Sequence, residues 1–106
     1  MKFRRSTVRI KTENKPIYDE WKDGRANQHV TNDIMNAIVE GRFDHYKHEE
    51  RPKRTYHLEK TYIVGDYDKI NKALRYAEDV LNYESLGALV DKILENESKE
   101  SIMKNR

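Results

Sequence analysis

The sequence predicts an α+β fold that is predominantly helical and consists of two strand–helix–helix units. The first observation behind this prediction is a run of alternating basic and β-branched residues near the start of the chain. The second is that the order strand, helix, helix occurs twice along the 106 residues. A lone strand has open edges, so we expect each strand to pair with another, either within one chain or between subunits.

The first unit, residues 1–41, opens on its strand. Residues 2–11 read KFRRSTVRIK, in which five residues are basic and none is acidic. Val8 and Ile10 fall on one side of an extended chain and are expected to be buried. The opposite, cationic side of the strand carries Arg5, Thr7, Arg9 and Lys11.

Two helices are expected to complete the first unit. Pro16 suits the first turn of a helix, and Gly24 is typical of the position where a helix stops. Thr31 or Asn32 is expected to cap the second helix, which Gly41 closes. The apolar residues at helical spacing are Ile17, Tyr18 and Trp21 in the first helix and Val30, Ile34 and Ile38 in the second.

Residues 42–54 (RFDHYKHEERPKR) predict a polar, basic linker, because almost every side chain is polar and Pro52 opposes a helix. The second unit covers residues 55–97. Its strand is expected within TYHLEKTYIV, and its helices over DYDKINKALRYAEDVLN and after a Ser85 cap. Aligning Ile10 with Ile63 gives an offset of 53 residues, whereas aligning Ile34–Met35 with Leu89–Val90 gives 55. Residues 98–106 are expected to form a disordered tail.

This pattern resembles the ribbon–helix–helix family of DNA-binding proteins, of the Arc and MetJ type. The matching stretches are VRIKTENKPIYDEWKDGRANQHVTNDIMNAIV and YIVGDYDKINKALRYAEDVLNYESLGALVDKIL, so the chain resembles two copies in tandem. The resemblance implies that two strands form an antiparallel ribbon and that four helices close a shared core behind it. It also implies that this ribbon enters the major groove of DNA.

The resemblance assigns roles to particular residues. The base-reading side chains would be Arg5, Thr7, Arg9 and Lys11. In the family, the start of the second helix holds the DNA backbone, which implies phosphate contacts for Thr31 and Asn32, and we add Arg4 to this group. Lys60, Tyr62 and Val64 would face outward from the second strand, a poor set for reading bases, so the second unit serves either DNA binding or assembly.

We therefore expect a sequence-specific, double-stranded DNA-binding protein: a transcriptional repressor, a plasmid or mobile-element maintenance factor, or a transfer accessory factor. The alternative is an antitoxin-like or scaffold protein whose C-terminal tail folds on a protein partner. Charged residues make up 38% of the chain and hydrophobic residues 36%, so we expect a small core. Small proteins with little core often gain stability by forming dimers. The divergence of the two strands also favours a homodimer, in which like strands pair, over a pseudo-dimer within one chain.

The sequence gives little support to other functional classes. The chain has no cysteine, and no apolar run approaches the roughly 20 residues that a membrane span needs, so we expect a cytoplasmic protein without membrane contact. His45, His48 and Glu49 have metal-ligand chemistry, but histidines in a polar linker are usually solvated. We expect no metal and no cofactor. Without a phosphate-binding glycine loop or a recognisable catalytic set, we expect no enzymatic activity.

Overall fold

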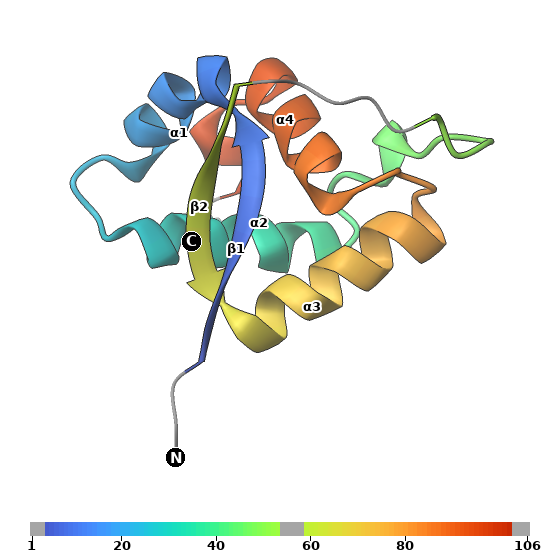
Figure 1. The fold of residues 1–106 in the computed structure, drawn as a ribbon, viewed down its shortest axis with the longest axis horizontal. Helices are drawn as coiled ribbons and strands as arrows, with labels where there is room; N and C mark the ends of the chain where they lie inside the picture. The colour runs from blue at the N-terminus through green and yellow to red at the C-terminus, as the bar shows by residue number, and fades with distance from the viewer. Residues whose placement is uncertain (1–3, 54–58, 103–106) are drawn as a thin grey trace.

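The computed structural model describes residues 4–53 and 59–102. Within them the chain is predominantly helical and contains one two-stranded antiparallel sheet, which confirms the fold class at this level (Figure 1). The strands and α-helices, in chain order, are β1 (Arg5–Lys11), α1 (Lys15–Lys22), α2 (Asn27–Val39), β2 (Lys60–Asp66), α3 (Tyr67–Arg75) and α4 (Leu86–Asn96).

The sheet is a ribbon formed within one chain, which is one of the two arrangements that the sequence left open. β1 pairs with β2 in a register that runs from Arg5 opposite Asp66 to Lys11 opposite Lys60. Val8, Ile10 and Ile63 point from the ribbon into the core and are almost completely buried. In Figure 1 the two strands cross in front of α2, with α1 and α4 toward one end of the ribbon and α3 at the other.

The two strands are equivalent at a spacing of 55 residues, since β1 starts at Arg5 and ends at Lys11 while β2 starts at Lys60 and ends at Asp66. Val8 therefore corresponds to Ile63, which it also faces across the ribbon. The same spacing of 55 residues relates Ile34 in α2 to Leu89 in α4, so one offset fits both the strands and these two helices. The alignment of Ile10 with Ile63 was wrong, because Val8 and Ile10 are both buried and alternation alone could not choose between them.

Helices cover the outer edges of both strands. Beside β1, the Lys11 backbone N–H donates to Asp91 Oδ1 on α4 (3.0 Å), and a Cβ on Gly87 would lie only 2.1 Å from the Arg9 carbonyl oxygen. Beside β2, the Asp66 N–H donates to Asn32 Oδ1 on α2 (2.8 Å). Each outer edge of the ribbon therefore has one backbone N–H bonded to a helix side chain, and α4 lies close against the edge of β1.

One cluster of buried side chains draws on both halves of the chain and lies behind the ribbon. Its largest completely buried members include Tyr18, Phe43, Ile34, Leu81 and Ile93. Both halves of the described chain therefore contribute to one core.

The ends of the helices were predicted with mixed success. Ser85 caps α4 by accepting a hydrogen bond from the Ala88 N–H (3.1 Å), as expected. The first helix ends where Gly24 indicated: its C-cap is Asp23 in the left-handed region, and Gly24 also has a positive φ. The predicted cap at Thr31 or Asn32 was wrong, because α2 begins at Asn27. Its first turn is polar and exposed, so the apolar stripe that starts at Val30 marks the packed part of the helix rather than its beginning.

The predicted linker packs against the second half over its first part. Phe43 is buried and its ring stacks on Tyr46, and the His48 N–H donates to the Leu81 carbonyl (3.0 Å). Residue 54, the last of the predicted linker, lies outside the described residues, as do residues 55–58 of the predicted second strand.

The start of the C-terminal tail is ordered, contrary to expectation. Lys99–Ser101 form a short 3-10 helix, and Ile102 is only 3% exposed. The Tyr46 and Ser101 hydroxyls both donate to the Glu97 carboxylate, and the bond from Tyr46 holds the pKa of Glu97 below its ordinary value. Residues 103–106 of the tail lie outside the described residues.

Candidate functional site

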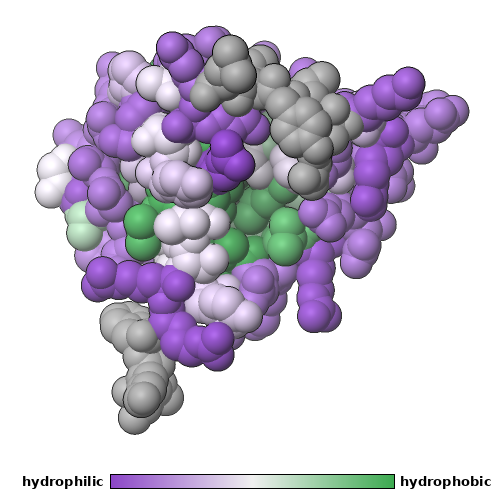
Figure 2. All heavy atoms as spheres, viewed as in Figure 1, coloured by the Kyte–Doolittle hydropathy of each residue, from purple (hydrophilic) through white to green (hydrophobic). Residues whose placement is uncertain are grey.

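The outward face of the ribbon brings the predicted base-reading residues together. The side chains of Arg5, Thr7 and Arg9 are exposed, and Lys11 is half-buried at the end of the strand. Alternate residues of a strand share a face, which places these four side chains in one row. Figure 2 shows hydrophilic residues around this side of the molecule and hydrophobic surface beside the ribbon near its centre.

Two of the arginines lie against tyrosine rings. The Arg4 guanidinium is 4.1 Å from the centre of the Tyr67 ring, and the Tyr67 N–H donates to the Arg4 carbonyl (3.0 Å). The Arg9 guanidinium is 5.8 Å from the ring centre of Tyr62, its cross-strand neighbour. These contacts orient both cations at modest energy while leaving their N–H groups accessible. The sequence did not reveal them, because each joins residues more than fifty positions apart.

Lys11 differs from the arginines because its charge is paired. Its ammonium lies 3.6 Å from the Glu95 carboxylate, next to the buried Asp91 that accepts its backbone N–H. Asn14 bridges the two acids, with its side-chain amide donating to Asp91 (2.8 Å) and to Glu95 (3.0 Å). Burial raises the pKa of Asp91, and the bonds from Asn14 and Lys11 offset only part of that effect. Lys11 forms an ion pair with Glu95, and Arg5 lies opposite Asp66 across the ribbon.

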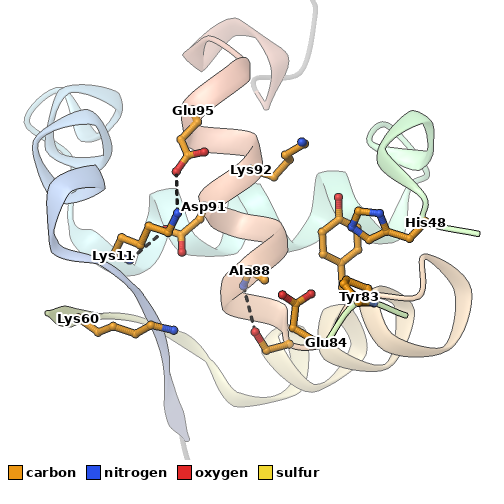
Figure 3. Close-up of a pocket in the computed structure, with 11 residues that line it drawn as sticks. Lys11, His48, Lys60, Tyr83, Glu84, Ala88, Asp91, Lys92 and Glu95 are labelled. Atoms are coloured by element: carbon orange, nitrogen blue, oxygen red, sulfur yellow. Dashed lines mark hydrogen bonds and ion pairs between the residues drawn. The ribbon is translucent and has the colours of Figure 1, made fainter. Parts of the chain in front are cut away.

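A cavity of about 310 Å³ opens next to Lys11. Figure 3 shows Lys11 and Lys60 on the ribbon side of this cavity and Lys92 and Glu95 on α4. Glu84 and Asp91 also line it. The three ammonium groups are therefore matched by three carboxylates, so the described part of the lining has no net charge to attract an anion.

The second strand contributes the other half of the same face. Tyr62 is 57% exposed, and Lys60 and Val64 are half-buried beside the row of basic residues. The Asp66 carboxylate accepts a hydrogen bond from the Lys69 N–H (3.2 Å) and so caps α3. Alternation identified the outward residues of this strand, but no local pattern could show that they flank Arg9 and Thr7.

Thr31 and Asn32, the predicted phosphate-binding residues, are engaged within the protein. Thr31 is completely buried in the second turn of α2, where its hydroxyl lies 2.7 Å from that of Tyr18. Asn32 accepts the edge N–H of Asp66. The helix start on which their predicted role depended lies one turn earlier, at Asn27.

Comparisons with known proteins give no relative. No protein-family model matches the chain, and no curated protein or solved structure matches it.

The side chains that could bind a metal ion lie apart from one another. Among residues 4–53 and 59–102, no group of three or more His, Asp or Glu side chains is placed to hold a metal ion. His45 lies 3.3 Å from Glu97, while the His48 ring packs beside Tyr83. None of the helices in these two ranges has the length and apolarity needed to cross a membrane. The outward face of the ribbon is thus the surface whose chemistry most directly suggests a ligand.

Proposed function

We propose that this chain binds double-stranded DNA by inserting its β1–β2 ribbon into the major groove, in the manner of ribbon–helix–helix proteins. The observation that carries this proposal is the row of Arg5, Thr7 and Arg9, all exposed on the outward face of a two-stranded ribbon. The major groove admits a two-stranded ribbon, and arginine pairs with the two acceptors on the edge of guanine.

The spacing of the row suits the spacing of bases. Side chains two residues apart on a strand lie about 7 Å apart, which is close to the rise of roughly two base pairs at 3.4 Å each. Arg5, Thr7 and Arg9 can therefore each address a different base pair without a change in the backbone. Arg4, held against Tyr67 at the end of the ribbon, is placed to contact a phosphate beside the groove.

The arrangement of elements supports the family assignment. Each strand is followed by two helices, the strands pair antiparallel, and α2 and α4 occupy related positions against the ribbon. We assign the protein to DNA-bound regulation, as a repressor, a plasmid or mobile-element maintenance factor, or a transfer accessory factor. The alternative, a tail that folds on a protein partner, has less support because Ile102 already packs in the core.

The proposal is tested by the binding of the purified chain to duplex pools at several salt concentrations. We expect affinity to fall steeply between low and moderate salt, because cations released from the phosphates accompany binding. The substitution Arg9→Ala should weaken binding to a preferred duplex by about 1–3 kcal/mol, the usual cost of losing a bidentate base contact.

The matched control is Arg75→Ala, which removes an exposed arginine from α3 rather than from the ribbon. It should change binding much less than Arg9→Ala. Equal effects of the two variants would remove the base-reading role of Arg9, and no binding to any duplex at low salt would leave the chain as a scaffold.

A further inference from the structure

The two strands of the ribbon offer different chemistry at equivalent positions. Positions 55 residues apart are related by a two-fold rotation about the Val8–Ile63 pair. On the outward face this rotation exchanges Arg9 with Val64 and Thr7 with Tyr62. A homodimer would repeat one side chain at both positions, whereas this chain places a cation or a hydroxyl on one side and an apolar or aromatic group on the other.

Neither strand can contact a groove without the other. Paired strands lie about 4.8 Å apart, well inside the roughly 12 Å width of the major groove. Thr7 faces Val64 and Arg9 faces Tyr62 across the ribbon. A groove that receives the arginines of β1 therefore receives the outward side chains of β2 as well, although the sequence alone left this open.

The outward residues of β2 have a natural partner among the bases. The thymine C5-methyl is the apolar group of the major groove, and apolar side chains select it. Tyr62 is 57% exposed and Val64 half-buried, so both present apolar surface to the groove. Asp66, the acidic residue on this strand, lies opposite Arg5 at the end of the ribbon, and its carboxylate caps α3.

We propose that one chain recognises an asymmetric DNA site, with guanine contacted by Arg9 in one half and a thymine methyl group contacted by Val64 at the equivalent position of the other half. This inference rests on the proposed function. A seven-residue strand spans about 20 Å, so the site covered by one ribbon is roughly six base pairs. Those base pairs are not an inverted repeat.

The test begins with selection of bound duplexes from a random pool, followed by trimming of the best duplex to the part that one chain protects. We expect a core with guanine in one half and thymine in the other. Replacing those thymines one at a time with uracil removes only the methyl group, and should weaken binding about fourfold at the contacted position.

The variant Val64→Ser removes both γ-methyl groups of the side chain and should abolish the effect of uracil at one position. The matched control Val80→Ala changes a valine that is 42% exposed in the helical segment after α3, and should leave the uracil effect unchanged. Tyr62→Ala, at a more exposed position, provides a second variant if Val64→Ser folds poorly.

The outcomes separate the two proposals. An inverted repeat within the site of one chain, or full affinity with uracil at every thymine, overturns the asymmetric site and leaves DNA binding intact. Failure to enrich any duplex overturns both. An asymmetric core whose uracil effect disappears in Val64→Ser supports both.

Discussion

At the scale of single residues, the ribbon depends on one buried carboxylate. Asp91 is 5% exposed and accepts hydrogen bonds from the Lys11 backbone N–H and the Asn14 amide. These bonds join α4, the end of β1 and the turn that follows β1. A charged acceptor holds donors well, but its burial costs solvation energy.

The first prediction concerns the pH dependence of stability. Burial raises the pKa of Asp91 above its ordinary value of 3.8, so the folded chain binds this proton more tightly than the unfolded chain does. Between the ordinary and the raised pKa, the free energy of unfolding should therefore fall as pH rises. Asp91→Asn keeps an acceptor oxygen and should remove that slope, as measured by urea unfolding across the acidic range.

The control for this measurement is Asp79→Asn, which removes an exposed carboxylate. The quantity to compare is the unfolding free energy of the wild type minus that of each variant. A difference for Asp91→Asn that increases with pH would mean that the hydrogen bonds outweigh burial, contrary to our expectation.

At the scale of elements, the contact between α4 and β1 sets how the ribbon lies on the helices. Gly87 faces the Arg9 carbonyl, and any Cβ there would overlap the strand backbone. The glycine is needed for this close approach rather than for an unusual backbone angle.

We predict that Gly87→Ala destabilises the fold by about 1–3 kcal/mol, the usual cost of overpacking a rigid contact. The expected sign is informative, because the same change in an exposed helix interior stabilises by about 1 kcal/mol. Thermal or urea unfolding measures the effect, with Lys92→Ala on the exposed side of α4 as the control. An unchanged or increased stability of Gly87→Ala would contradict the close packing of α4 on β1.

The elements themselves were largely predictable, because their signals are local. Alternation identified β1 and its outward row, and the Ser85 cap identified the start of α4. The start of α2 was not predicted, because its first turn is helical but makes little contact with the core. The packing of the tail was not predicted, because Ile102 is a single apolar residue in a polar segment.

Only the part of the candidate site that lies on β1 could be predicted from the sequence. The cationic row follows from one strand, whereas the neighbours Tyr62, Val64 and Tyr67 follow from pairing across more than fifty residues. Nothing in a local window specifies such pairing, and the acidic partners of Lys11 on α4 were missed for the same reason.

At the scale of the whole molecule, the ribbon is complete within one chain. In the homodimer expected from the sequence, each strand pairs with the same strand of a second chain. In the structure, β1 pairs instead with β2 of the same chain. Dimerisation remains a prediction, but it would use a surface other than the pairing of β1 with β2.

The internal pairing is testable because the chain has no cysteine of its own. Thr7 and Val64 face each other across the ribbon and point outward. The double variant Thr7→Cys/Val64→Cys should oxidise to a disulfide within a monomer, since opposed residues of antiparallel strands lie within disulfide range. Non-reducing electrophoresis measures the product, and Thr7→Cys alone controls for links made by collision. A disulfide-linked dimer specific to the double variant would show that the strands pair between chains.

The separation of the two strands along the chain also sets the timing of their assembly during translation. β1 is synthesised before the residues of β2 and α4 that cover its two edges. At 5–20 residues per second, the ribosome needs roughly 3–10 seconds to pass from the end of β1 to the start of β2. Until β2 has been made, the backbone groups of β1 have no strand to pair with, and neighbouring chains can engage them once β1 has left the ribosome. The pace of elongation through the middle of the message thus governs how long each new molecule is exposed to misassembly.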